Sequence, residues 1–262
     1  MRRGDFDRFT DGLAEWAAEA DGVLGLVLLG STAATTHPPD DWSDHDVYVI
    51  AEPRMTEVLR GSIAWLPERD AAVVLHERDT AHGAWVVYDD GHLLEYAVFA
   101  PDELASSRSG AHRIVVDRRG DLAALMRPTL APPPRDPATI ASGLHRTLLV
   151  GAGRAARGER LAARRHLVDA AGALLTLAAM LARRERPLGD PQDPWRRVEQ
   201  TDPSLAASLD GILARSDAVA ALELARLAER VAGHQQWWPR ALAAAVRGRL
   251  GAPGARDAAG LA

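Results

Sequence analysis

The chain has 262 residues, of which 47% are hydrophobic and 26% are charged. These are ordinary values for a folded globular protein, and they lie far from the composition of a disordered chain. There is no cysteine, and all 31 basic residues are arginine because the sequence contains no lysine. A disulfide framework, a thiol nucleophile, a cysteine zinc site, a Schiff base and lysine-dependent phosphate sites of the Walker A or kinase type are therefore excluded.

The net charge and the absence of long apolar segments argue against two kinds of binding partner, nucleic acids and membranes. A net charge of −5 argues against sequence-independent binding of nucleic acid, which needs a basic face. The first seven residues are charged and lack the apolar region of a secretory signal. The longest aliphatic stretch, residues 170–182, spans 13 residues, whereas about 20 are needed to cross a bilayer. We expect a cytoplasmic protein that binds neither nucleic acid nor membrane.

Short runs rich in β-branched and aromatic residues occupy the first half of the chain and predict strands. They cover residues 23–29, 46–51, 71–76, 84–88 and 93–99. Asp90-Gly91 separates the last two runs. Because glycine tolerates the positive φ of a tight turn, this dipeptide predicts a β-hairpin.

A proline-dense segment at residues 128–137 marks a change in composition and charge. Residues 1–130 contain 12 arginines and 23 acidic residues, a net charge of about −11, whereas residues 131–262 contain 19 and 13, about +6. Proline at this density permits neither a central strand nor a helix interior. The sequence therefore predicts an α+β domain at residues 1–127, a linker at 128–137 and an all-helical domain at 138–262.

The second half is dominated by alanine and leucine at helical spacing, and helices are expected over residues 161–181, from Ser216 and from Trp238. The apolar stripe predicted for the first of these helices consists of Leu161, Leu167, Val168, Ala171, Leu174, Leu175, Ala178 and Leu181.

The chemically informative segment begins with Gly30-Ser31 after a predicted strand, and after twelve intervening residues it continues with Asp44 and Asp46. Two residues at i and i+2 of a strand point to the same face, with Cα atoms roughly 7 Å apart. Two like charges so placed repel by several kcal/mol at an effective dielectric constant of about 20. With no lysine in the chain and no arginine beside them in sequence, a hard divalent cation, above all Mg²⁺, is the natural partner.

A third acidic residue, Glu95, interrupts an otherwise apolar predicted strand. A buried carboxylate without a partner costs several kcal/mol, so it is expected either to pair with an arginine on a neighbouring strand or to be functional. We favour a third metal ligand. Asp89, Asp90 and Asp169 are the next candidates for this role.

The order of these features resembles the nucleotidyltransferase superfamily of DNA polymerase β: strand, Gly-Ser, a gap of about a dozen residues, Asp-x-Asp entering a second strand, and an acid on a later strand. A catalytic domain followed by a helical domain is similar to the nucleotidyltransferases that modify lincosamides and aminoglycosides. The resemblance rests on motifs in the first ~100 residues and on architecture alone beyond them. It implies a mixed β-sheet flanked by helices in the first domain, followed by a helical bundle that binds the substrate.

The resemblance also implies roles for five residues. Asp44, Asp46 and Glu95 would form the catalytic site and hold two Mg²⁺ ions, and Gly30 and Ser31 would contact the β- and γ-phosphates of ATP or another NTP. His45 departs from the family pattern, which has an apolar residue there; the strand pleat directs it away from the acids.

The function that follows is transfer of a nucleoside monophosphate, AMP from ATP being the first choice, to a hydroxyl of a small molecule such as an antibiotic. Two alternatives remain open at this point. One is AMP transfer to a protein side chain, as in nucleotidyltransferase antitoxins. The other is a catalytically silent protein that binds nucleotide.

Several other residues have more ordinary interpretations. The nine histidines show no zinc-ligand spacing. Arg165 and Asp169 form an i,i+4 pair, as expected on a solvated helix face. Trp195, Trp237 and Trp238 are expected to pack between helices.

Overall fold

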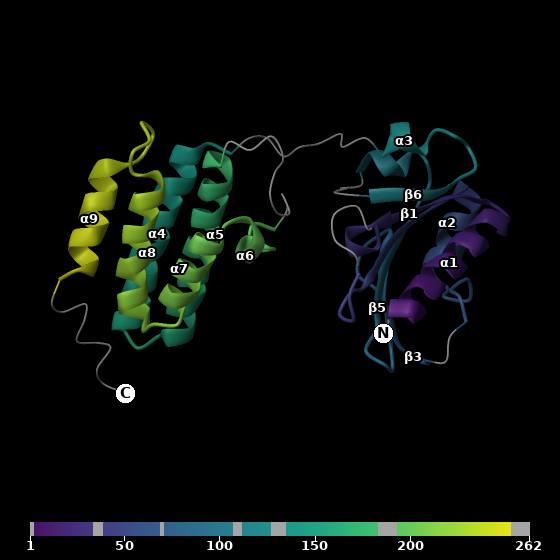
Figure 1. Ribbon diagram of the computed structural model, residues 1–262, viewed down its shortest axis with the longest axis horizontal. Coiled ribbons are helices and arrows are strands. Elements are labelled where there is room, and N and C mark those ends of the chain that lie inside the picture. The colour runs from purple at the N-terminus through teal and green to yellow at the C-terminus, as the bar shows by residue number, and fades with distance from the viewer. Residues whose placement is uncertain are drawn as a thin grey trace. The chain divides into compact units, whose positions relative to one another are not determined.

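The computed structural model describes residues 3–33, 39–68, 71–106, 112–126, 135–182 and 193–252. The chain divides into two compact units, Met1–Ala131 and Pro132–Ala262 (Figure 1). Most of the expected linker, residues 128–134, lies outside the described residues. Its last two residues, Asp136 and Pro137, begin helix α4.

The first unit is a mixed β-sheet with helices. Its elements in chain order are α1 (Arg3–Glu19), β1 (Val23–Leu29), the 3₁₀ turn η1 (Gly30–Ala33), β2 (His45–Ala51), α2 (Pro53–Arg60), β3 (Val73–Arg78), β4 (Gly83–Tyr88), β5 (Leu93–Phe99), the 3₁₀ turn η2 (Glu103–Ser106), β6 (His112–Asp117) and α3 (Leu122–Leu125).

The six strands lie in the order β3-β4-β5-β2-β1-β6. Only β2 and β5 are parallel, and every other neighbouring pair in the sheet is antiparallel. This arrangement, followed by helices in the second unit, confirms the predicted α+β class. The parallel pair at the centre also brings together two segments that are about 50 residues apart in sequence.

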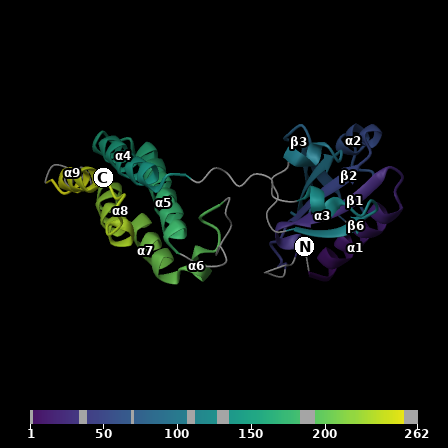
Figure 2. The same ribbon diagram turned by 90° about the horizontal axis from the view of Figure 1, so that it is seen from above.

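The two faces of this sheet carry different cores. On one face, α1 packs Phe9 and Leu13 against β1, β2, β4 and β5, and α2 adds Leu59 (Figure 2). On the other face a smaller cluster lies near β1 and β6, where Leu122 and Met126 cover Val27. The rest of this second face, over β3, β4 and β5, carries partly exposed side chains.

The sequence located most of these strands. β1 and β5 have the predicted bounds, β2 and β4 begin one residue earlier, and β3 lies two residues later than expected. The predicted hairpin joins β4 to β5, with Gly91 at φ 81° and its N–H donating to the Tyr88 carbonyl. Strand β6 was not predicted.

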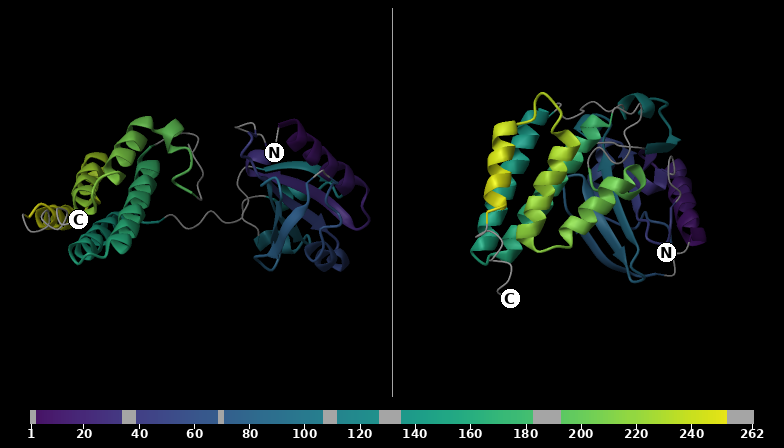
Figure 3. Two further views of the ribbon diagram at one scale, coloured as in Figure 1. Left: turned by 90° about the horizontal axis from the view of Figure 1, so that it is seen from below. Right: turned by 60° about the vertical axis from the view of Figure 1, so that its left-hand side comes forward.

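The second unit consists of helices α4 (Pro137–Ala156), α5 (Arg160–Leu181), α6 (Val198–Thr201), α7 (Pro203–Leu213), α8 (Asp217–Ala232) and α9 (Arg240–Leu250). α4, α5 and α8 pack against one another, and α9 packs against α4 and α8 (Figure 3). The Asp136 carboxylate caps α4 by accepting from the N–H groups of Ala138 and Thr139. No helix in the described parts of the chain is both long and apolar enough to cross a bilayer.

The predicted stripe of α5 is correct for its inner residues and wrong at two positions. Leu167, Leu174 and Leu175 are buried in the helical core, whereas Leu161 is 90% exposed and Val168 is 41% exposed. The two exposed residues are seven positions apart and therefore share one side of α5, whereas the buried leucines lie on another side. The buried Trp238 packs in this core, as expected.

His145 is a fully buried histidine within the same core. Its Nδ1 lies 2.8 Å from the carbonyl oxygen of Ala141, one turn earlier in α4, and the ring of Trp238 meets it edge-on with centroids 5.0 Å apart. Burial is the largest influence on this imidazole, and it lowers the pKa below the ordinary value of 6.5.

This lowered pKa predicts acid sensitivity of the helical unit. As pH falls below about 6.5, the unfolded chain binds a proton at His145 before the folded chain does, so the free energy of unfolding decreases. Thermal melts followed by far-UV circular dichroism at about pH 7.5 and about pH 5.5 should therefore show a larger loss of melting temperature for the natural chain than for His145→Gln. The exposed His234→Gln is the matched control and should behave like the natural chain; an unchanged loss in His145→Gln would contradict the assignment.

Candidate functional site

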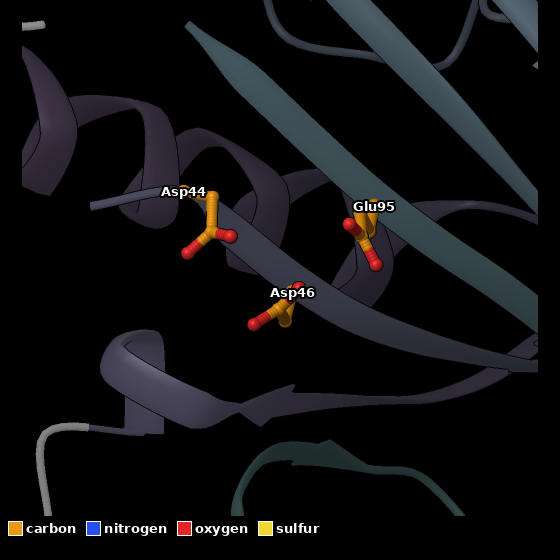
Figure 4. Close-up of side chains that lie close together, drawn as sticks. All are labelled: Asp44, Asp46 and Glu95. Carbon is orange, nitrogen blue, oxygen red and sulfur yellow. The ribbon is translucent and has the colours of Figure 1, made fainter. Parts of the chain in front are cut away.

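Three carboxylates meet at the point where β2 begins. Asp44 immediately precedes β2, Asp46 is its second residue, and Glu95 lies on the neighbouring strand β5 (Figure 4). One carboxylate oxygen of each lies within 4.8 Å of those of the other two, and all three side chains are partly buried. The structure thus brings together the three acids that the sequence analysis selected.

Strand register explains why these residues meet. Asp46 is the direct partner of Glu95 in the parallel pair β2–β5, and residues directly opposite one another point to the same face of a sheet. Asp44 is two residues before Asp46 and shares that face. The cross-strand neighbours of Glu95 are therefore Asp46 on β2 and Trp85 on β4, so neither neighbouring strand supplies the arginine that was the alternative partner.

The site concentrates negative charge in a partly buried position. Burial is the largest cause that raises the pKa of Glu95, and the charges of Asp44 and Asp79 raise it further. Burial and the charge of Asp46 likewise raise the pKa of Tyr48 on the same face of β2. Carboxylate oxygens at this spacing are the donor set that hard divalent cations prefer, so the residues present fit the magnesium ions that the family resemblance implies. No other three His, Asp or Glu residues in the described part of the chain come this close together.

Gly30, predicted as a phosphate contact, also makes room for one of the acids. It has φ 51°, and a Cβ at this position would lie 2.6 Å from Oδ2 of Asp46. A side chain here would thus be strained by the backbone conformation and would collide with the carboxylate. Ser31 follows at the same turn, and its hydroxyl donates to the Asp44 carbonyl at 3.4 Å.

Thr32 is a residue of the site that the sequence analysis missed. It is 2% exposed; its hydroxyl donates to the Asp44 carbonyl at 3.3 Å and accepts from the Asp46 N–H at 3.2 Å. One side chain on η1 therefore fixes the backbone on both sides of His45. The sequence signal was its place directly after Gly30-Ser31, but nothing in the sequence shows that the hydroxyl turns inward.

His45 points to the opposite face, as the pleat requires. It is fully buried, stacks on Phe6 with ring centroids 3.8 Å apart, and contacts His92 and Thr10. The distance from its Nδ1 to Nε2 of His92 is 2.9 Å, and that from its Nε2 to the Thr10 hydroxyl is also 2.9 Å. This cluster anchors the start of β2 to α1 and β5 from behind.

The other candidates for the third acid lie elsewhere. Asp89 and Asp90 belong to the turn between β4 and β5, where Asp90 accepts from the backbone N–H of His92. Asp169 lies in the second unit on an exposed part of α5, with Arg165 4.0 Å away. That pair matches the predicted solvated helix face.

No protein-family model and no curated protein matches the chain. Among solved structures, the chain is similar to a nucleotidyltransferase-like protein from Exiguobacterium sibiricum 255-15, with a TM-score of 0.37 and 15% sequence identity, covering 86% of this chain and 75% of that one. A similarity at this level says nothing of chemistry, which has to be argued from the side chains.

Removing one charge from the acidic cluster should stabilise the metal-free chain. Asp44→Asn eliminates a carboxylate that raises the pKa of Glu95, and the relief of repulsion is expected to be about 1 kcal/mol, or roughly 3–5 °C in melting temperature. The same variant should lose most of the stabilisation that Mg²⁺ gives the natural chain. Calorimetry with and without Mg²⁺ measures both effects. Asp11→Asn, on the exposed face of α1, is the control for a general change in charge; a lower metal-free melting temperature in Asp44→Asn would mean that the cluster is structural.

Thr32 provides an independent test of how the site is built. Thr32→Val keeps the shape of the side chain but leaves the Asp46 N–H and the Asp44 carbonyl without the hydroxyl, which should cost about 1–3 kcal/mol of unfolding free energy. Thr32→Ser retains the hydroxyl and should lose markedly less. Urea unfolding compares the two variants, and equal stabilities would show that these hydrogen bonds do not hold the site.

Proposed function

We propose that this chain is a Mg²⁺-dependent nucleotidyltransferase that moves a nucleoside monophosphate, AMP from ATP, to a hydroxyl of a small molecule. The observation that carries the proposal is the convergence of Asp44, Asp46 and Glu95 beside the turn at Gly30. A cluster of acidic side chains alone does not distinguish one function from another. Its position against a turn whose glycine leaves the backbone uncovered favours a site for a phosphate-bearing substrate.

In this proposal the three acids would hold two Mg²⁺ ions. Asp46 is paired with Glu95 and lies two residues after Asp44, so the three carboxylates would hold the ions together. When bound, the cations supply positive charge that offsets the triphosphate and stabilises the transferring phosphoryl group. Without them, the acidic first unit repels a nucleotide, so nucleotide binding should depend on the divalent cation.

The turn η1 would bind the β- and γ-phosphates. Within the part of the chain that the structure describes, the Ser31 hydroxyl makes one long contact, of 3.4 Å to the Asp44 carbonyl, so it is able to turn and donate to a phosphate oxygen. Backbone N–H groups of the same turn supply further donors, and Gly30 permits their close approach. This places the departing pyrophosphate on the β1 side of the acids.

The reaction then consists of one displacement. A bond forms between the acceptor oxygen and the α-phosphorus, the bond from that phosphorus to the oxygen bridging it to the β-phosphate breaks, and pyrophosphate leaves. The acceptor hydroxyl loses its proton in this step. Glu95 is the carboxylate we assign to receive it, because it lies on β5, on the side of the cluster away from the turn at Gly30.

The test is to incubate the full chain with Mg²⁺, labelled ATP or GTP, and a panel of hydroxylated antibiotics and metabolites, and to look for added mass by mass spectrometry. We expect the mass of a nucleoside monophosphate on at least one acceptor, with release of pyrophosphate, and loss of both with EDTA or in Asp44→Asn. Asp11→Asn should retain activity. Nucleotide binding of equal affinity with and without Mg²⁺, together with no product, would contradict the proposal and favour a silent nucleotide-binding protein.

A further inference from the structure

A row of side chains continues from the acidic cluster across the sheet. Asp46 on β2 is paired with Glu95 on β5, Glu95 with Trp85 on β4, and Trp85 with Glu77 on β3. Directly paired residues share a face of the sheet. Trp85 therefore lies on the same face as the acids and directly next to one of them.

Trp85 is much more exposed to solvent than its neighbours on β4. It is 44% exposed, whereas Ala84 and Val86 on either side of it are buried in the core of the opposite face. Two residues along, a second row on the same face joins Leu75, Val87 and Leu93, and Leu75 is 38% exposed. We call Leu75, Trp85, Val87 and Leu93 the Trp85 strip, an apolar surface that begins at Glu95.

The in-line geometry of the proposed reaction determines which of the two substrates approaches this strip. In an in-line displacement the entering oxygen and the departing pyrophosphate are on opposite sides of the phosphorus. Gly30 follows β1, which neighbours β2 on one side, and the Trp85 strip lies on the other side, beyond β5. With the pyrophosphate at η1, the acceptor hydroxyl has to arrive from above β5 and β4.

The charges beside the strip limit which acceptor can bind. Glu77 is on the same face, next to Trp85, and Asp79 lies close enough to Glu95 to raise the pKa of that acid. The arginine of β3, Arg78, alternates to the other face and donates to Glu57 at 3.1 Å. An acceptor with negative charge would be repelled.

From this arrangement, and on the basis of the proposed function, we infer that Trp85 determines acceptor specificity by packing against an aromatic or apolar ring adjacent to the reacting hydroxyl, and that the acceptor is neutral or cationic. Contact with a tryptophan face buries a large apolar area at little conformational cost, and it also attracts cations. The nucleotide does not touch Trp85 in this arrangement. The inference thus separates the acceptor side of the site from the nucleotide side.

The experiment measures binding rather than turnover. The full chain is saturated with Mg²⁺ and the non-transferable analogue α,β-methylene-ATP, and isothermal titration then compares 4-nitrophenyl with methyl glucoside, galactoside and mannoside. We expect at least one 4-nitrophenyl glycoside to bind about tenfold more tightly than its methyl partner, and Trp85→Ala to abolish that preference. Trp85→Phe should keep most of it, and Val58→Ala, an exposed apolar residue of α2, should keep all of it. Glucose 6-phosphate should bind more weakly than methyl glucoside.

Each other result has a distinct meaning. If the natural chain does not bind the Mg²⁺ analogue complex, the proposed function fails. If that complex binds but no aryl glycoside is preferred, or the preference survives in Trp85→Ala, the inference about Trp85 is overturned while the proposed function stands. If Trp85→Ala instead weakens the analogue itself by about tenfold, Trp85 contacts the nucleobase and the inference is likewise overturned.

Discussion

The parallel pairing of β2 with β5 is the constraint on which the site depends. Parallel strands need a long connection between them, and here that connection contains α2 and the strands β3 and β4. The register of the pair sets Asp46 opposite Glu95. A shift of one residue would turn Glu95 into the core if it occurred in β5, or Asp44 and Asp46 together if it occurred in β2, and either would break the cluster.

The same pairing decides what surrounds the acids on each side. β1 lies next to β2 and delivers the turn that contains Gly30, while β4 lies next to β5 and delivers Trp85. The acidic cluster therefore has the turn that contains Gly30 on one side and the apolar Trp85 strip on the other. Two substrates of different chemistry could approach the same carboxylates without competing for the same contacts.

The three acids that the structure brings together could be selected from the sequence because their signal is local and chemical. Asp46 and its neighbour at i−2 share a face in any strand, and Glu95 stands out in an apolar run. Thr32 could not be predicted, because its role comes from a hydrogen bond with a residue 14 positions further along the chain. β6 has only three consecutive apolar residues, Ile114, Val115 and Val116, between charged neighbours, so it shows neither an alternating pattern nor a long apolar run. Leu161 shows the opposite failure, since an apolar residue of a helix need not lie on the side that is buried.

The buried cluster behind β2 has a further consequence, because the donor at one end sets the direction of its hydrogen bonds. When Thr10 donates its hydroxyl proton to the Phe6 carbonyl at 3.0 Å, the same hydroxyl accepts from Nε2–H of a neutral His45. Nδ1 of His45 is then the acceptor for Nε2–H of His92. A chain of hydrogen bonds thus runs from His92, just before β5, through His45 and Thr10 to the Phe6 carbonyl in α1. It fixes the ring orientation of His45 and, with it, the angle at which β2 presents its two aspartates to the other face.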